Sequence, residues 1–385
     1  MKRNIKHELV NWIDGMKISK VHFQQTEDYF LDSLCDARAI RLTNTNYGLL
    51  PFSNSNEGSS EIEISERVTN KVEIKLRRCN AITAGGCRIS YNPEPSEYMI
   101  LTHSFDTDKD EDAHQSRYWD VILSVNPYKR VPTGIPDEEE NPPRHPYVAT
   151  SYQLSFMPKG EIISDRLGLH HLVIGRIRQN GGRYEVDTNF IPPCTSMSSH
   201  PDLMHYYDRF GMLLNEIERT SKVIINKVQN KSHNSSIALH INSICRDIMR
   251  YIATIYFSYR NLGHEYTPVE VVNYFSTLAH TCYISLSFIG KNEKEELLKY
   301  FYEWSDVTPG SFEELLSNTL NIIYEHNNIR PVMTQVESFL QMFSELWIKL
   351  SMLEYIGQHK ENIVVSERAQ QQEGPKTKGG WTILD

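Results

Sequence analysis

The fold of this chain is decided at Val186-Asp187-Thr188-Asn189-Phe190-Ile191-Pro192-Pro193-Cys194, where the pattern of apolar residues changes. Proline has no backbone N–H for a strand ladder, so the two consecutive prolines end strand pairing. Before them, from Tyr47 to Thr188, short apolar runs are bounded by Gly, Pro, Asn and Asp, as in sandwiches and barrels. After them, from Asp202 to Gly357, the apolar spacing is helical. We therefore expect an α+β fold: an N-terminal antiparallel β-sandwich followed by a C-terminal α-helical bundle.

The first part of the chain contains several predicted strands and one predicted helix. The expected strands are Val72–Leu76, Tyr98–Leu101, Trp119–Val125, Val148–Phe156, Leu169–Ile177 and Tyr184–Val186, and Ala81–Ser90 is typical of a hairpin that turns at Gly85-Gly86. A short helix is predicted to begin at Ser19 and to lie against the sheet, since Phe23, Phe30 and Leu34 recur at helical spacing. We interpret residues 1 to about 195 as one β-sandwich domain.

The helical part contains two heptad seams. The first consists of Ile237, Ile241, Ile244, Ile248, Tyr251 and Ile255, and the second of Val332, Val336, Phe339, Phe343, Leu346, Leu350 and Leu353. Isoleucine at both seam positions favours three- or four-stranded packing, which suggests a trimer. The alternative is that both seams pack inside the bundle of one subunit, and the sequence leaves the two open.

Other signals in the helical part mark helix ends. Thr267-Pro268-Val269-Glu270 and Ser311-Phe312-Glu313-Glu314 are predicted capping boxes, and Gly357 is expected to cap the last long helix. The apolar run from Tyr283 to Gly290 is interpreted as buried bundle core. Residues 358–385 are polar, so a disordered tail is expected. Its apolar tip, which contains Trp381, Ile383 and Leu384, is either a docking peptide or a frayed end.

Composition excludes several classes of protein. The 40 basic and 49 acidic residues give a net charge of −9, and the chain has no basic block, so we expect no nucleic-acid partner. The N-terminus lacks an apolar run long enough for a signal sequence or a membrane span, so a cytoplasmic protein without direct membrane insertion is expected. The six cysteines have no zinc-type spacing, which predicts reduced, buried thiols.

No motif indicates catalysis or a cofactor. The carboxylates of Asp106–Asp112 alternate as in a calcium loop, but the sixth position is Glu111 instead of Gly and the twelfth is Arg117 instead of Glu, so a solvated loop is expected. His170 and His171 are interpreted as strand residues on opposite faces. Nucleotide-binding and hydrolase motifs are absent from the sequence. A two-carboxylate glycoside hydrolase is permitted by this acidic sequence without being specified by it, so we expect neither an enzyme nor a cofactor or metal site.

Three segments carry a resemblance to a known family. They are the N-terminal motif with Trp12, Gly15, Met16, His22 and Phe23, the segment Asn46-Tyr47-Gly48-Leu49, and the junction motif Phe190-Ile191-Pro192-Pro193-Cys194. In order and spacing they resemble the TssK family, the baseplate adaptors of type VI secretion systems. The structural interpretation of these residues is Trp12 and Phe23 as core, Gly15 as a turn with positive φ, and the prolines as a rigid joint.

The resemblance implies a fold and a role. A β-sandwich shoulder similar to phage receptor-binding proteins is implied for residues 1–195, and a helical neck for residues 196–305. A homotrimer is implied, whose shoulder binds the baseplate wedge proteins TssF and TssG. Its far end is implied to reach a membrane-anchored complex at the inner face of the cytoplasmic membrane, which makes the protein a structural, non-enzymatic adaptor.

The C-terminal region departs from the family pattern. Family members usually end in a separate β-containing head, whereas residues 306–357 are predicted to be further helices and residues 358–385 the tail. This departure leaves open which membrane protein is bound in place of the usual TssL and TssM, and whether the tail binds it. The alternative function is a phage-tail-like module that binds a receptor or a carbohydrate, since it would share the sandwich and the trimeric stalk.

Overall fold

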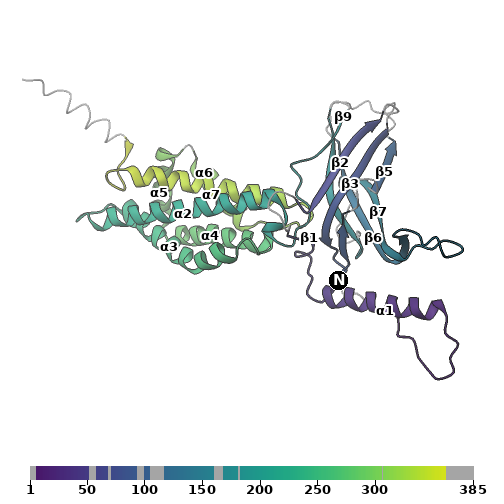
Figure 1. Cartoon of the computed structure of the whole chain (residues 1–385). Helices are drawn as coiled ribbons and strands as arrows, with labels where there is room; N and C mark the ends of the chain where they lie inside the picture. The colour runs from purple at the N-terminus through teal and green to yellow at the C-terminus, as the bar shows by residue number, and fades with distance from the viewer. Residues whose placement is uncertain are drawn as a thin grey trace, which may run out of the picture. The chain divides into compact units, whose positions relative to one another are not determined.

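The computed structural model describes residues 6–51, 58–67, 71–92, 99–104, 117–159, 168–180, 183–305 and 307–360 (Figure 1). The chain forms two compact units. Unit 1 consists of Met1–Arg209, Ser258–Asn273 and Ile323–Thr334, and unit 2 of Phe210–Phe257, Tyr274–Ile322 and Gln335–Asp385. The possible calcium loop Asp106–Asp112 and the tip with Trp381, Ile383 and Leu384 lie outside the described residues.

Unit 1 contains two antiparallel sheets. Their strands are β1 (Gly48–Leu49), β2 (Ser60–Arg67), β3 (Lys71–Ile82), β4 (Arg88–Tyr91), β5 (Met99–Ser104), β6 (Arg117–Thr133), β7 (Tyr147–Pro158), β8 (His171–Asn180) and β9 (Arg183–Val186). In the five-stranded sheet β3 pairs with β1, β2, β4 and β5, and the four-stranded sheet has the order β7-β6-β8-β9. The predicted α+β class, with antiparallel strands before the helices, is confirmed.

The core of unit 1 lies between these sheets. Val72, Ile74 and Leu76 of β3 are buried as their spacing predicts, but Glu73 between the first two is buried as well, so the alternation with exposed charges holds only in part. A Cβ atom on Gly175 of β8 would lie 2.5 Å from Cδ1 of Ile62 on β2, so the two sheets are in close contact here and only glycine fits without a shift. The expected hairpin is confirmed, since β3 and β4 pair on either side of a turn in which Gly86 has a φ of 78°.

Three sequence-based expectations for unit 1 are corrected. Helix α1 (Lys20–Ala39) begins after Ser19 as expected, but it is 20 residues long instead of short. Its predicted core stripe of Phe23, Phe30 and Leu34 is more than half exposed. His170 lies in the turn before β8, so the two adjacent histidines are not both strand residues.

The remaining helices follow the sheets in sequence. They are α2 (Pro201–Gln229), α3 (Ser236–Leu262), α4 (Pro268–Ser287), α5 (Lys291–Trp304), α6 (Pro309–Leu320) and α7 (Ile329–Met352). In unit 2 the fully buried Trp347 of α7 donates a hydrogen bond from Nε1 to Ser221 Oγ at 3.1 Å. The Trp347 ring also stacks on Phe343, with ring centroids 4.0 Å apart. Aromatic packing therefore fills the centre of this unit.

The isoleucine seam of α3 is buried within the chain. Its five isoleucines, Ile237, Ile241, Ile244, Ile248 and Ile255, are at most 5% exposed. Tyr251, the remaining seam residue, donates a hydrogen bond from its hydroxyl to the Tyr274 carbonyl at 2.6 Å. Of the two alternatives for this seam, packing inside one subunit is the one found, since all five isoleucines are buried and only Tyr251 is half-buried.

Three details of the helical part also differ from expectation. The capping box at Thr267 is confirmed, with Glu270 accepting the Thr267 N–H at 2.7 Å, but α6 is capped by Thr308 and not by Ser311. Gly357 has the left-handed φ of 83°, yet it lies beyond the end of α7 at Met352. The run from Tyr283 to Gly290 is not wholly core, since Phe288 is 82% exposed.

The burial of the seam gives a testable prediction. Ile248→Ala removes a fully buried side chain and is expected to lower the free energy of unfolding by about 3 kcal/mol, from lost transfer energy and the cavity left behind. The mass of the assembly measured by light scattering should not change. Leu239→Ala, at an exposed position of the same helix, is the control and should change stability by less than about 0.5 kcal/mol in urea denaturation. Dissociation of an oligomer caused by Ile248→Ala would contradict burial within one chain.

Candidate protein-binding surface

Helix α1 is attached to unit 1 through a bulge in strand β6. The register between β6 and β7 shifts between Asn126 and Arg130, so the residues between them leave the ladder. The side-chain oxygen of Asn126 accepts hydrogen bonds from the backbone N–H groups of Tyr128 and Lys129 at 3.1 and 3.2 Å, which holds the bulge open. Bulges re-aim side chains, and this one directs Tyr128 and Arg130 towards α1.

A buried carboxylate receives the first of these two side chains. Asp32 of α1 is fully buried and accepts the hydroxyl hydrogen bond of Tyr128 at 2.9 Å. Its other oxygen accepts the backbone N–H groups of Lys6 and His7 at 2.5 and 3.1 Å. A buried carboxylate is stable only when donors surround it, so Asp32 fixes α1 and the N-terminal segment together.

Arg130 makes the second attachment. Its guanidinium donates to the Asp28 carboxylate at 2.7 Å, to Glu27 at 3.2 Å and to the Gln24 carbonyl at 3.3 Å. The side chains of Arg130 and Asp28 are 21% and 17% exposed, so this pair is only partly screened by water. No sequence pattern singled out Arg130, Tyr128 or Asp32, although Pro127 inside a strand pattern is a signal for a bulge.

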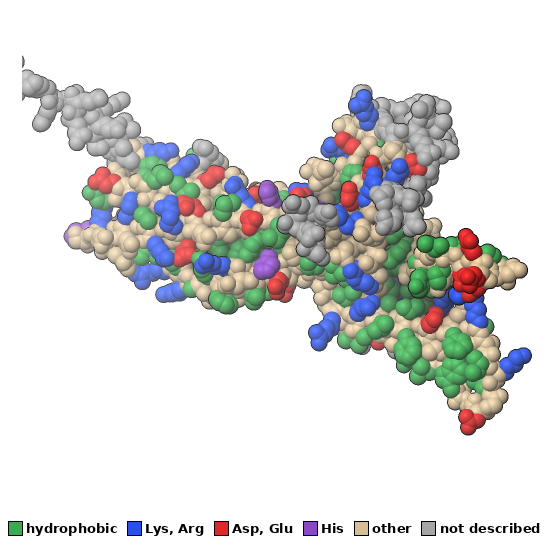
Figure 2. All heavy atoms as spheres, viewed as in Figure 1, with side chains coloured by type: hydrophobic (Ala, Val, Ile, Leu, Met, Phe, Trp, Pro, Cys, Tyr) green, Lys and Arg blue, Asp and Glu red, His purple; other side chains and the backbone are tan. Residues whose placement is uncertain are grey.

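The polar attachment leaves the apolar side of α1 facing outward. Phe23, Phe30 and Leu34 lie on one helical stripe, opposite Asp28 and Asp32. Trp12 lies 6.2 Å from Phe23 between ring centroids, and Ile18 is also exposed. We call Trp12, Ile18, Phe23, Phe30 and Leu34 the outward α1 face. Figure 2 shows apolar side chains gathered over this part of the molecule. Contiguous exposed apolar surface of this kind marks a site for another macromolecule.

A depression of about 520 Å³ opens beside this face. Ile18, Phe23 and Val148 supply apolar walls, while Glu27 and Arg130 line its polar side. Apolar pockets with a polar rim accept the anchor side chains of a protein partner. The depression and the outward α1 face therefore form one continuous candidate surface within unit 1.

The N-terminal motif residues have identifiable local roles. Gly15 has a φ of 79°, as expected for a turn, and the Met16 N–H donates to the Ile13 carbonyl at 3.3 Å. His22 caps α1 by accepting the Ser19 N–H at Nδ1, at 3.2 Å. Trp12 and Phe23 are 49% and 56% exposed, so their interpretation as core was wrong. Because Asp28 and Asp32 attach α1 to unit 1, the opposite side of the helix, which carries Phe23, faces outward.

The junction motif forms a buried joint with the segment around Leu49. Leu49 donates its N–H to the Pro193 carbonyl at 2.7 Å, and its own carbonyl accepts the Thr195 N–H at 2.9 Å. A Cβ on Gly48 would lie 2.1 Å from the Pro193 carbonyl oxygen, and its φ of 118° also requires glycine. The five residues of the motif, Phe190, Ile191, Pro192, Pro193 and Cys194, are all buried. The two later segments of the family resemblance therefore touch each other.

A buried ion pair supports the joint from β6 and β8. Arg176 donates from Nε to Asp120 at 2.7 Å, and both side chains are under 10% exposed. The guanidinium carbon lies 4.2 Å from the centre of the Phe190 ring, which places the cation over the aromatic face. This contact fixes the first residue of the motif against the four-stranded sheet.

His326 closes the joint from a distant part of the sequence. Its Nε2 donates to the Tyr47 carbonyl at 2.7 Å, and its Nδ1 accepts the Tyr324 hydroxyl at 3.0 Å, so the ring is held as the neutral tautomer. Burial lowers the pKa of His326 to about 4. Burial, followed by the nearby charge of Arg330, also lowers the pKa of His200 to about 4. No pattern in the sequence pointed to His326, because its partner lies 279 residues away.

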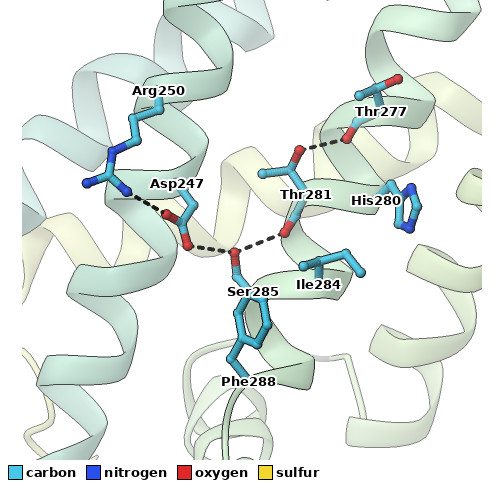
Figure 3. A pocket seen from close by; sticks show the side chains of 8 residues that line it. All are labelled: Asp247, Arg250, Thr277, His280, Thr281, Ile284, Ser285 and Phe288. Atoms are coloured by element: carbon cyan, nitrogen blue, oxygen red, sulfur yellow. Dashed lines mark hydrogen bonds and ion pairs between the residues drawn. The ribbon is translucent and has the colours of Figure 1, made fainter.

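Unit 2 carries a separate depression of about 380 Å³ between α3 and α4 (Figure 3). Asp247 accepts hydrogen bonds from Arg250 and from the Ser285 hydroxyl, both at 3.0 Å. Ile284 and Phe288 supply exposed apolar surface beside them. The Asp247 carboxylate is therefore engaged within the chain, and Ile284 and Phe288 offer apolar contact beside it.

Neither a metal cluster nor a spanning helix is present in the described part of the chain. Among those residues no group of three His, Cys, Asp or Glu side chains is arranged to hold a metal ion. No helix among them is both long enough and apolar enough to span a bilayer. All six cysteines are buried thiols, as the sequence predicts.

The fold and the surface together define an α+β protein whose best-formed candidate site is a surface for another protein. The chain belongs to the TssK family of bacterial type VI secretion proteins, since the family model described as "Bacterial Type VI secretion, VC_A0110, EvfL, ImpJ, VasE" matches residues 22–335. The family expected from the N-terminal and junction motifs is therefore confirmed. No curated protein matches the sequence.

One solved structure supports a shared fold, and two others are similar at lower TM-scores. A crystal structure of TssK is 14% identical with a TM-score of 0.51, and the match covers 87% of this chain and 68% of that one. TssK from the type VI system of EAEC, in complex with a nanobody, is 12% identical with a TM-score of 0.49, covering 85% and 100%. TssK in a TssK-TssF-TssG baseplate subcomplex is 12% identical with a TM-score of 0.43, covering 88% and 100%.

The buried joint predicts a pH dependence of stability. The pKa of His326 is about 4 in the folded chain and about 6.5 in the unfolded chain, so the unfolded state binds more protons between these values. The free energy of unfolding should therefore fall as the pH falls from 6.5 to 4, by up to about 1.4 kcal/mol per pH unit for this residue. Urea denaturation at pH 5 and 7 measures it.

The variant His326→Gln should have a shallower pH dependence than the native chain. His233→Gln, at an exposed position, is the control and should keep the native slope. An unchanged slope in His326→Gln would show that this histidine does not titrate on unfolding.

Proposed function

We propose that this protein is a structural baseplate component of a type VI secretion system. In this role it is an adaptor that joins the baseplate wedge to a membrane-anchored complex, and no catalytic step is involved. Membership of the TssK family supports the proposal. The observation that carries it is the outward α1 face, an apolar surface that polar contacts hold in a fixed position.

The wedge proteins TssF and TssG are the proposed partners of this face. A TssK is found with TssF and TssG in the baseplate subcomplex named above. The face offers two aromatic anchors, Trp12 and Phe23, next to a depression with a polar rim. Aromatic anchors in pockets supply most of the binding energy of protein interfaces. In this proposal Gly15, Met16 and His22 shape the segment that presents those anchors.

The domain organisation is proposed in the same terms. Residues 1–195, all within unit 1, form the β-sandwich shoulder, and residues 196–305 the helical neck. Residues 306–357 replace the usual head, and residues 358–385 form the tail. The buried joint of Leu49, Pro193 and His326 supports a rigid connection between the end of the shoulder and the first helical residues of unit 1.

The binding proposal can be tested with purified partners. The double variant Phe23→Ser/Phe30→Ser removes one anchor and a second aromatic side chain from the outward α1 face, and should weaken binding to a TssF–TssG complex by roughly tenfold or more. Its folding should be unaffected, because both side chains are more than half exposed. Pull-down and titration measure the loss. Ile323→Ser changes an exposed apolar residue of unit 1 outside this face and should bind normally.

Two outcomes would oppose the proposal. Native affinity in the double variant would exclude the outward α1 face as the wedge site. If the native protein binds an oligosaccharide but does not bind TssF and TssG, the alternative function as a phage-tail-like carbohydrate-binding module would be favoured.

Copy number is the second test. The adaptor is proposed to be a homotrimer, so light scattering on the purified chain should give three times the 44.7 kDa of one chain. The isoleucine seam contributes no surface to such a trimer, because it is buried within the chain. A monomer at micromolar concentration would contradict the trimeric adaptor.

A further inference from the structure

Two cysteines and a histidine meet where α1 touches the β3–β4 hairpin. The sulfur atoms of Cys35 on α1 and Cys87 after the hairpin turn lie 3.4 Å apart. The Nδ1 of His170, in the turn before β8, lies 3.1 Å from the Cys87 sulfur. Both thiols are buried, at 5% and 2% exposure, while His170 is half-buried. The cluster therefore has a nucleophile, a base beside it and a second thiol within reach.

The backbone holds these groups in place. A Cβ on Gly86 would lie 2.1 Å from the Cys35 carbonyl oxygen. The backbone of the hairpin turn therefore lies in close contact with the backbone of α1, and only glycine fits at this position. On its other side the Gly85 N–H donates to the Leu169 carbonyl at 2.8 Å. The clamped turn holds the two sulfur atoms 3.4 Å apart, compared with about 2.05 Å in a disulfide, so a small further approach would bring them to bonding distance.

Two other cysteines of unit 1, Cys79 and Cys194, lack this arrangement in the described contacts. Cys79 lies nearby in sequence on β3, and burial raises its pKa to about 12, which disfavours the reactive thiolate. Burial also raises the pKa of Cys194, whose thiol donates to the Pro192 carbonyl at 3.2 Å. A thiolate is the nucleophile in thiol oxidation, so an adjacent base distinguishes Cys87 from these two.

We propose that Cys35 and Cys87 form an oxidation site that a hydroperoxide converts into a disulfide. His170 takes the Cys87 proton, and the thiolate attacks one oxygen of hydrogen peroxide. The O–O bond breaks, Cys87 becomes a sulfenic acid, and the leaving hydroxide takes the proton from His170 to form water. The Cys35 sulfur then attacks the Cys87 sulfur, the S–O bond breaks, and the departing hydroxide leaves as water with the Cys35 proton. The two thiols lose two electrons in total, and one peroxide is reduced to two waters.

The disulfide would tie α1 covalently to the hairpin. In the reduced protein the helix is held by the polar contacts of Asp32, Asp28 and Cys35 with unit 1. The bond would close a loop between positions 52 residues apart, which restricts the movement of α1 relative to the hairpin and leaves the outward α1 face uncovered. The inference rests on the geometry of unit 1 and does not depend on the proposed function.

The test uses the full-length protein, freed of reductant and treated with hydrogen peroxide. The number of thiols titrated in denaturant should fall from six to four, and peptide mapping should find Cys35 joined to Cys87 with the loss of two hydrogens. Dithiothreitol should restore six thiols. Six remaining thiols, a cross-link between other cysteines, or a sulfinic acid at Cys87 without a cross-link would overturn the proposal.

Variants separate the roles of the three residues. Cys35→Ser should abolish the cross-link and leave a sulfenic acid at Cys87 that dimedone traps. Cys79→Ser is the matched control, a buried cysteine of the same sheet, and should still form the Cys35–Cys87 bond with five thiols falling to three. His170→Gln should slow the loss of thiols roughly tenfold, with a flattened pH profile of the rate. An unchanged rate and pH profile would show that His170 is not the base for Cys87. If a variant fails to fold, peptide mapping of the oxidised native chain still shows whether Cys35 and Cys87 are the pair that is joined.

Discussion

The buried carboxylate of Asp32 is the constraint on which the candidate surface depends. Burying a carboxylate without hydrogen-bond donors costs a large free energy, so the surrounding residues must supply donors. The Tyr128 hydroxyl and the backbone N–H groups of Lys6 and His7 do so. Together with the Arg130–Asp28 pair, this requirement decides which side of α1 faces the sheet. The apolar stripe of Phe23, Phe30 and Leu34 is left on the outside. The candidate surface thus results from the way in which the helix is anchored, and the anchor itself arises from a bulge in β6.

The joint between the sheets and the first helical residues uses a different kind of interaction. Leu49 and Cys194 meet as neighbouring parallel chains, through backbone hydrogen bonds that only a glycine at position 48 permits. His326 then binds the Tyr47 carbonyl from a segment far along the sequence. Because these contacts are short, buried and mutually satisfied, they define one arrangement of the strand end and the junction motif. The prolines contribute by fixing φ and by having no N–H that would need a partner.

The two seams of the helical part illustrate how a periodic pattern is satisfied. Apart from Val332, which belongs to unit 1, their apolar residues are buried inside unit 2, where the Trp347, Phe343 and Phe301 rings fill the space between helices. A heptad pattern requires a neighbouring helix but does not specify whether that helix belongs to the same chain. Here neighbouring helices of the chain provide it. A surface that joins copies of the protein must therefore be found outside these seams.

The sequence by itself determined the order of β-rich and helical parts, the start of α1 after Ser19, the β3–β4 hairpin and the family. These features depend on local chemistry: the N-cap, glycine in the turn, the missing N–H of proline, and the spacing of apolar residues. Only the tertiary structure decided which face of α1 is buried, that the isoleucine seam is internal, and that Cys35, Cys87 and His170 meet. Periodicity gives the stripe on a helix, but the environment of that stripe is set by residues distant in sequence. For α1 those residues were Tyr128 and Arg130, and their position followed from a bulge whose effect no local pattern expressed.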